Sequence, residues 1–164
     1  MAQVTLGGNT VNTSGELPAV GSTAPPFSLT GSDLSDIAHD DYAGRSLVLN
    51  IFPSIDTPTC AQSVRTFNAR AADFDDATVL CVSADLPFAQ GRFCGVEGIE
   101  NVSAASTFRS SFGADYGVTL TDGKLAGVLA RAVVVIGPDG VVKHTELVGE
   151  IANEPDYDAA LASL

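Results

Sequence analysis

The sequence predicts an α/β fold with a mixed central sheet flanked by helices and an added N-terminal β-hairpin. Two apolar runs at 46–52 and 77–83 enclose an amphipathic helical pattern, which is the arrangement of a βαβ crossover with parallel strands. Farther along, strand-like runs at 130–136 and 141–148 flank a Gly-Pro-Asp-Gly turn. This second pair predicts an antiparallel hairpin next to the crossover.

The first half of the chain is expected to supply one edge of the sheet and the crossover. Alternating apolar and polar residues around Gly7-Gly8-Asn9 predict the N-terminal hairpin, an extension over residues 1–14 of a single domain that spans 1–164. In the crossover helix, Val64, Phe67, Ala71 and Phe74 recur at helical spacing. The other elements expected here are a loop at 15–26, a short strand at 27–29, a surface connection at 34–41, strands at 46–52 and 77–83, and the helix at 59–74.

The second half is expected to add a short helix that starts at Pro87, carries Cys94 and frays at Gly95 and Gly98. Further elements expected here are a strand at 102–105, a short helix at 107–112, a loop at 116–127, the 130–148 hairpin and an amphipathic helix that begins at Pro155. A parallel βαβ unit followed by an antiparallel hairpin and a helix is the order of the thioredoxin fold.

Composition excludes several classes of function. Eight Lys and Arg against twenty Asp and Glu give a net charge of −12, which cannot form a broad phosphate-binding face, so neither nucleic acid nor an anionic membrane is an expected partner. No apolar run is long enough to span a membrane and the first residues do not resemble a signal segment, so the expected location is cytoplasmic. No dinucleotide or phosphate-binding motif is present, and no cofactor is expected.

The chain has three cysteines, at positions 60, 81 and 94. An odd number without a secretory signal argues against a static disulfide framework, and the absence of a C-x-x-C pair or a nearby histidine argues against a metal site. His39 and His144 need no functional explanation. Cys81 lies in the middle of an apolar strand and is expected to be a core residue, whereas Cys94 lies in a fraying element that can move.

Cys60 stands at the junction between a Pro-rich turn and the predicted crossover helix. A helix N-terminus and a nearby cation stabilise a thiolate over a thiol, which makes this position typical of a cysteine nucleophile. Thr57 or Thr59 can cap the helix, with Pro58 in its first turn. The alternative is that Cys60 is an inert buried residue, as most free cysteines are.

The segment Pro53-x-x-x-Thr57-x-x-Cys60 resembles the active-site signature of the peroxiredoxins. The longer run Asn50 to Cys60, followed by Ser63-Val64-Arg65-Thr66-Phe67, is similar to the thiol peroxidase subfamily of bacteria, an atypical 2-Cys group. The likeness extends to Gly-Glu-Leu-Pro at 15–18, to Asp85-Leu86-Pro87-Phe88-Ala89-Gln90 with Arg92-Phe93-Cys94, and to Leu129-Ala130-Arg131-Ala132. It implies an enzyme with antioxidant activity that reduces hydrogen peroxide and organic hydroperoxides.

The resemblance implies a role for each matching residue. Cys60 attacks a peroxide oxygen and becomes a sulfenic acid, and Cys94 resolves it in an intramolecular disulfide that thioredoxin or a similar dithiol reduces. Arg131, an arginine among apolar neighbours, would pair with the thiolate, or alternatively with a structural carboxylate. Thr57 would hydrogen-bond the peroxide and Pro53 would exclude water. We expect the sulfurs of Cys60 and Cys94 to lie apart before oxidation, so that both segments must unwind to join them.

The resemblance also implies a homodimer, for which apolar residues of the 112–120 segment are the expected contact area: Phe112, Tyr116, Val118 and Leu120. A rival function is a peroxide-sensing switch or chaperone-like binding protein that uses the same two cysteines to control a partner. A thioredoxin-type oxidoreductase is disfavoured because C-x-x-C is absent, and a cysteine hydrolase because no histidine is placed as a base.

Overall fold

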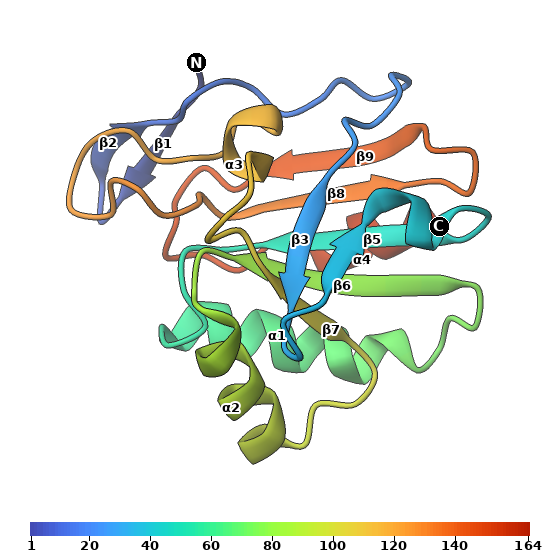
Figure 1. The fold of residues 1–164 in the computed structure, drawn as a ribbon. Helices are drawn as coiled ribbons and strands as arrows, with labels where there is room; N and C mark the ends of the chain where they lie inside the picture. The colour runs from blue at the N-terminus through green and yellow to red at the C-terminus, as the bar shows by residue number, and fades with distance from the viewer.

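The computed structural model describes all residues from Met1 to Leu164 and contains two sheets (Figure 1). A small antiparallel hairpin pairs β1 (Gln3–Leu6) with β2 (Asn9–Asn12). The seven-stranded sheet has the order β4-β3-β7-β6-β5-β8-β9. Its strands are β3 (Ser28–Gly31), β4 (Asp36–Ala38), β5 (Ser46–Ile51), β6 (Ala77–Ser83), β7 (Ser103–Ser106), β8 (Ala132–Ile136) and β9 (Val142–Leu147).

Four α-helices and one 3₁₀ helix connect these strands: α1 (Pro58–Ala71), α2 (Pro87–Glu97), α3 (Phe112–Asp115), α4 (Tyr157–Ala162) and η1 (His39–Tyr42). The helices α1, α2 and α4 cover one face of the large sheet, because their buried side chains share one apolar cluster with alternate residues of the central strands. Val48 of β5 faces these helices, whereas Leu47 and Leu49 face the other cluster, which α3 and the 116–118 segment help to cover. In Figure 1, α1 and α2 lie together below the sheet.

The crossover and the C-terminal hairpin are confirmed. Strands β5 and β6 pair in parallel over six residues each, and β8 joins the other side of β5 in antiparallel register. Strand β9 pairs with β8, with an irregularity at Val135 and Ile136. The crossover helix begins at Pro58 and ends at Ala71, three residues before the expected end, and α4 begins at Tyr157 with Asp156 rather than Pro155 at its start.

Two local expectations are wrong. The short helix expected at 107–112 is instead α3 at Phe112–Asp115, because the hydroxyls of Ser106 and Ser110 accept backbone N–H groups two residues onward and hold 106–111 in turns. The surface connection expected at 34–41 contains an edge strand, β4, and the 3₁₀ helix η1. Asp33 accepts the backbone N–H and the hydroxyl of Ser35, which folds the chain back so that β4 can pair with β3.

The apolar segment proposed as a dimer contact is also misplaced. Phe112, Tyr116 and Val118 are fully buried and Leu120 is 1% exposed, so these side chains belong to the core and supply no surface. The reason lies in two isolated bridges, Thr13 to Leu120 and Thr119 to Leu129, which hold the segment against the rest of the fold. The large apolar side chains that are exposed lie elsewhere, among them Leu86, Phe88 and Phe108.

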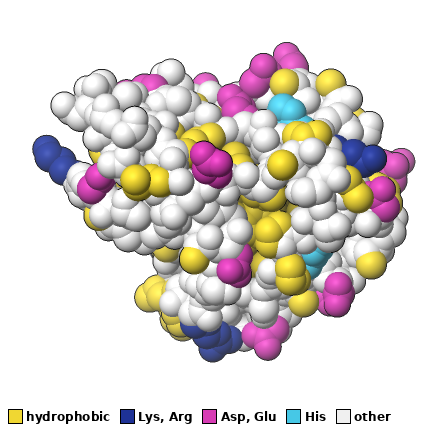
Figure 2. Space-filling model, turned by 90° about the horizontal axis from the view of Figure 1, so that it is seen from above, with side chains coloured by type: hydrophobic (Ala, Val, Ile, Leu, Met, Phe, Trp, Pro, Cys, Tyr) yellow, Lys and Arg dark blue, Asp and Glu magenta, His cyan; other side chains and the backbone are white.

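The distribution of charged side chains on the surface is consistent with the excess of Asp and Glu in the sequence. On the face shown in Figure 2, acidic side chains are scattered among uncharged ones and the few Lys and Arg side chains do not gather into a patch. No helix combines the length and the apolar character needed to cross a membrane. No group of three or more His, Cys, Asp or Glu side chains is arranged to hold a metal ion.

Candidate active site

Cys60 lies in the first turn of α1, as its third residue, and its side chain is completely buried. The helix starts there because Pro58 occupies the position where a missing N–H costs nothing, and Thr57 has the extended backbone of an N-cap residue. Behind Cys60, the hydroxyl of Ser63 donates to the Cys60 carbonyl at 2.7 Å, and the Asn50 amide donates to that hydroxyl at 3.1 Å. These contacts join β5 to the first turn of the helix.

Arg131 lies directly before β8 and directs its guanidinium at the thiol. Its Nη2 is 3.3 Å from the Cys60 Sγ, and its Nε donates to the Ile151 carbonyl at 2.8 Å. The side chain is only 2% exposed and forms no ion pair with a carboxylate. The alternative of a structural carboxylate partner is therefore wrong. The remaining nitrogen, Nη1, is buried without a hydrogen-bond partner, so the guanidinium has an unused donor beside the sulfur.

Thr57 and Pro53 lie on the loop between β5 and α1. The Thr57 hydroxyl donates to the Ser54 carbonyl at 3.1 Å and does not cap the helix, so the expected side-chain cap is wrong for Thr57. It is also wrong for Thr59, whose hydroxyl donates to the Ala152 carbonyl at 3.1 Å. Because the Thr57 donor is already used, its oxygen lone pairs are what this hydroxyl can offer a ligand. Pro53 is buried, two residues after the end of β5.

A loop that contains Glu150 supplies two of the carbonyls around this site, and the N-terminal hairpin holds that loop. The Glu150 carboxylate accepts the backbone N–H groups of Ala152 and Gly8, both at 2.9 Å, and the Thr5 hydroxyl at 3.1 Å. Thr5 also exchanges backbone hydrogen bonds with Gly149 and Ile151. The hairpin therefore fixes the Ile151 carbonyl that orients Arg131.

The other two cysteines differ in accessibility, and all three cysteines are free. Cys81 is in the middle of β6 and 1% exposed, which confirms it as a core residue, and this burial raises the pKa of its thiol to about 12. Cys94 lies on α2, half-buried, and burial raises the pKa of its thiol as well. It packs at the margin of the apolar cluster that contains Cys60 and also borders a hollow of about 400 Å³ between α2, β7 and the β3–β4 turn.

Comparison with known proteins identifies the family. The Redoxin family model matches residues 19–161. The chain belongs to the redoxin family. A protein named thiol peroxidase from Mycobacterium tuberculosis (strain ATCC 25618 / H37Rv) is 68% identical over 164 residues, which are 100% of this chain and 99% of that one. A thiol peroxidase from Corynebacterium glutamicum is 55% identical over the same length.

A solved structure gives the same result. The crystal structure of a peroxiredoxin-like protein from Aquifex aeolicus superposes with a TM-score of 0.94 at 39% identity, covering 99% of this chain and 95% of that one. The predicted thioredoxin-like fold, the family and the enzyme class, a thiol peroxidase, are confirmed for this redoxin.

Sequence reasoning missed the polar groups that hold the site of this redoxin in place. Asp85 and Glu150 accept backbone N–H groups far away in the sequence, and Ser54 donates to the distant Asp85 carboxylate; no spacing rule reveals such contacts. One signal was available for Asp85. It follows β6 just as Ser54 follows β5, and the carboxyl ends of neighbouring parallel strands meet at one edge of the sheet.

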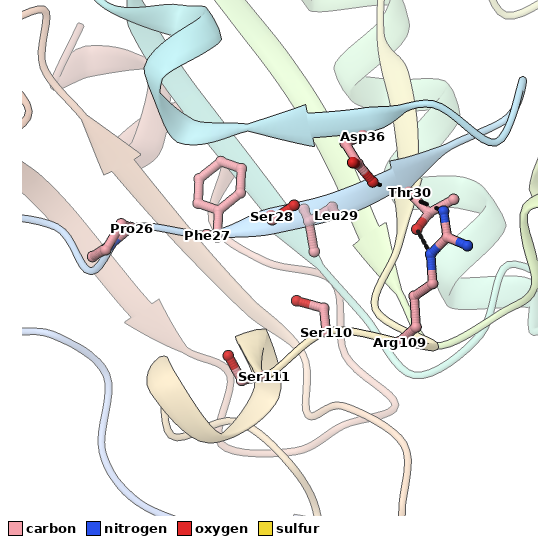
Figure 3. A pocket seen from close by; sticks show the side chains of 9 residues that line it. All are labelled: Pro26, Phe27, Ser28, Leu29, Thr30, Asp36, Arg109, Ser110 and Ser111. Atoms are coloured by element: carbon pink, nitrogen blue, oxygen red, sulfur yellow. Dashed lines mark hydrogen bonds and ion pairs between the residues drawn. The ribbon is translucent and has the colours of Figure 1, made fainter.

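One hollow borders the redoxin site without containing the thiol, and a second lies elsewhere in the fold. The first, of about 480 Å³, runs along the loop and first turn, between Thr57 and Phe93. The second, of about 470 Å³, lies between β3 and the segment before α3, where Arg109 donates to the Thr30 hydroxyl and Ser110 and Ser111 line the wall (Figure 3). No cysteine and no predicted site residue lines this second hollow, so it is separate from the thiol chemistry.

Proposed function

We propose that this redoxin reduces hydroperoxides through Cys60 and Cys94. The Cys60 thiolate attacks the terminal oxygen of the peroxide, the O–O bond breaks, and the other oxygen leaves with a proton as water or an alcohol. Cys60 is then a sulfenic acid. The observation that carries the proposal is the Arg131 Nη2 at 3.3 Å from the Cys60 sulfur, in a buried site where no carboxylate competes for the guanidinium.

Three groups would act on the transition state. The free Nη1 of Arg131 can donate to the peroxide oxygens while Nη2 remains on the sulfur, so that one cation orients both reactants. The Thr57 oxygen can accept the hydroxyl hydrogen of the peroxide. Pro53, buried beside the loop, would exclude bulk water and so strengthen these interactions. A lowered thiol pKa alone reduces nucleophilicity, so oriented donors are needed for selectivity toward peroxide.

The second half of the cycle needs movement. The Cys94 sulfur attacks the sulfenic sulfur, water leaves, and a Cys60–Cys94 disulfide forms. Both cysteines lie in ordered helices, one buried and one half-buried, so the first turn of α1 and part of α2 have to open. An external dithiol such as thioredoxin would then reduce the disulfide, because the chain has no C-x-x-C pair of its own.

Disulfide mapping after one equivalent of peroxide tests this assignment. In the wild type we expect a Cys60–Cys94 bridge, in Cys94→Ser a lasting sulfenic acid on Cys60, and in Cys60→Ser no oxidation. A Cys60–Cys81 bridge, or unchanged oxidation in Cys60→Ser, would overturn it. Consumption of many equivalents of peroxide with thioredoxin, thioredoxin reductase and NADPH supports a catalytic cycle, whereas a single stoichiometric oxidation supports a redox switch.

We also propose that the whole chain acts as one domain, in the cytoplasm and as a homodimer. The exposed Leu86, Phe88 and Phe108 support a dimer contact, since their segments are joined by the hydrogen bond from the Ser106 hydroxyl to the Asp85 carbonyl. Sedimentation should show a dimer for the wild type and a monomer for Phe88→Asp. A monomeric wild type would contradict the proposal.

A further inference from the structure

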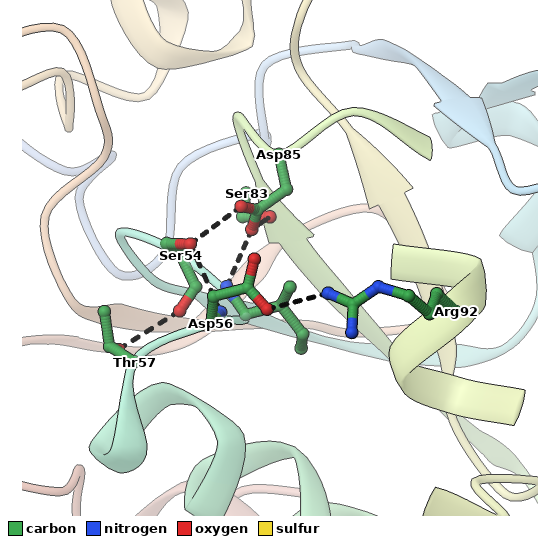
Figure 4. A network of polar contacts seen from close by, with 7 residues as sticks. Ser54, Asp56, Thr57, Ser83, Asp85 and Arg92 are labelled. Carbon is green, nitrogen blue, oxygen red and sulfur yellow. Dashed lines mark hydrogen bonds and ion pairs between the residues drawn. The ribbon is translucent and has the colours of Figure 1, made fainter. Parts of the chain in front are cut away.

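Asp85 is the centre of a polar network at the carboxyl edge of β5 and β6 (Figure 4). Its partly buried carboxylate accepts three hydrogen bonds: the Ser54 hydroxyl at 2.7 Å, the Ile55 backbone N–H at 2.7 Å and the Ser83 hydroxyl at 2.6 Å. The bonds to Ser54 and Ile55 join the segments that follow β5 and β6, since these two residues precede Asp85 by 31 and 30 positions. None of the reaction steps proposed above uses this carboxylate.

From Asp85 the contacts continue to the thiol. Ser54 accepts the Asp56 backbone N–H on its hydroxyl oxygen at 3.2 Å, and its carbonyl accepts both the backbone N–H and the hydroxyl of Thr57 at 3.1 Å. Thr57 is the N-cap residue of α1, and the turn that follows carries Cys60. Loss of the Asp85 carboxylate would therefore release the Ser54 side chain. The Thr57 hydroxyl, which donates to the Ser54 carbonyl, would then no longer be held in one orientation.

The same network also reaches the helix of the second cysteine. The Ser83 hydroxyl, which donates to Asp85, accepts the side-chain amide of Gln90 on α2 at 3.0 Å. On the outer side, Arg92 of α2 pairs with Asp56 of the loop at 3.0 Å, an exposed ion pair that Figure 4 shows spanning from the helix to the loop. The loop before Cys60 and the helix that carries Cys94 are thus held by one set of side chains.

We propose that Asp85 is a positioning residue that holds the 54–57 loop in its reacting arrangement and whose release allows Cys60 to move toward Cys94. The inference rests on the proposed roles of Cys60, Thr57 and Cys94. It predicts opposite effects on two steps. Without the carboxylate, the reaction with peroxide slows because the Thr57 hydroxyl and the first turn lose their fixed geometry, and disulfide formation accelerates because the open loop is more populated.

The variants are Asp85→Ala, which removes all three hydrogen bonds, and Asp85→Asn, whose amide can still accept from Ile55 and donate to Ser54. Ser54→Ala removes one of the three bonds to Asp85, together with the bond from the Asp56 N–H, and serves if Asp85→Ala does not fold. Asp41→Ala is the matched control. Asp41 also accepts a backbone N–H, that of Ala38, but it lies in η1 and is not part of the Asp85 network. Circular dichroism melts establish that each variant is folded before kinetics are compared.

The rate constant for reaction with hydrogen peroxide is measured by competition with a haem peroxidase, and disulfide formation by rapid quenching with a thiol-blocking reagent and mass spectrometry. For Asp85→Ala we expect the rate constant with hydrogen peroxide to fall about tenfold or more. We expect the rate of disulfide formation to rise about threefold or more. Asp85→Asn should lie between Asp85→Ala and the wild type, and Asp41→Ala should match the wild type. Both steps unchanged, or both slowed together, would overturn the proposal, because a merely structural role produces no opposite shift.

This outcome is distinguishable from failure of the proposed function. If Cys60→Ser abolishes oxidation and a Cys60–Cys94 bridge forms, but the Asp85 variants behave as the wild type, the reaction assignment holds and the role of Asp85 is wrong. If Cys60→Ser is still oxidised, the reaction assignment itself is wrong, whatever the Asp85 variants do.

Discussion

Replacement of Arg131 by methionine should separate activity from stability. Arg131 is 2% exposed, has no carboxylate partner and directs its guanidinium at the Cys60 sulfur, which is the group that it is proposed to serve in the reaction. Methionine fills similar space without the charge. Removing a poorly compensated buried charge favours the fold, whereas leaving the Ile151 carbonyl without its donor costs about 1–3 kcal/mol. These effects oppose each other, and we expect a small change in unfolding free energy.

The effect on the reaction should be much larger. A hydrogen bond to a charged group contributes about 1.5–3 kcal/mol, which corresponds to a factor of about 10 to about 150 in rate when the bond acts only in the transition state. The bond from Nη2 to the Cys60 sulfur and a second from Nη1 to the peroxide each fall in this range. Arg131→Met removes both bonds, so it should lower the rate constant with hydrogen peroxide by about 150-fold to about 10⁴-fold.

The assay must suit this chain, which has no tryptophan to report oxidation by fluorescence. Competition with a haem peroxidase for hydrogen peroxide gives the rate constant, and chemical denaturation gives the unfolding free energy. Arg131→Lys keeps the charge but loses the forked geometry, and its rate should lie between those of wild type and Arg131→Met. A wild-type rate in Arg131→Met would refute the reasoning, as would a fall in rate explained by a matching loss of folded protein.

Three further predictions concern Thr57, Glu150 and Cys81. Thr57→Val should lower the peroxide rate constant about 3- to 10-fold with little change in melting temperature, because the lost hydroxyl does not cap α1; Thr57→Ser should restore the rate. The Ala152 and Gly8 N–H groups hold the pKa of Glu150 below its ordinary value, so its stabilising effect is present above about pH 4.3 and is lost as the pH falls further. Glu150→Gln should accordingly flatten the fall in melting temperature between about pH 5 and pH 3, and parallel curves would contradict this. Burial raises the pKa of Cys81 from 9.0 to about 12. The contribution of its neutral thiol to the free energy of unfolding is therefore full below about pH 9 and is lost as the pH rises toward about 12. Cys81→Val should reduce that alkaline loss in urea unfolding, and an unchanged slope would speak against it.

The sequence predicted the central strands and helices well because their patterns are local. Residues 46–52 and 77–83 are apolar because both faces of these strands are buried, and Val64 and Phe67 recur at helical spacing because α1 covers one of those faces. The 107–112 segment was misassigned for the opposite reason. There, serine hydroxyls bond to nearby N–H groups, and that competition decides where α3 begins.

The same distinction applies to the site. The position of Cys60 could be predicted from the turn and the helix that enclose it, and the pairing of Arg131 from the cost of burying an arginine among apolar residues. Burial of Phe112 and Tyr116 could not, since their exposure depends on bridges to segments far away in the sequence. The role of the Ile151 carbonyl could not be predicted either, because any residue type can supply a backbone acceptor.

In the proposed cycle the site has to meet two conflicting demands, and the arrangement of its contacts suits both. The proposed reaction with peroxide needs Cys60, Thr57 and Arg131 to be fixed, and the proposed resolution needs the Cys60 turn to leave its place. The contacts of Arg131 and Glu150 come from the residue before β8 and from the 149–152 loop, which carry no cysteine and can stay in place throughout. Those of Asp85 and Arg92 join the loop before Cys60 to β6 and α2, so they have to yield when the disulfide forms. A fixed cation on one side and a releasable loop on the other would allow the thiol to depart and return to the same donor after reduction.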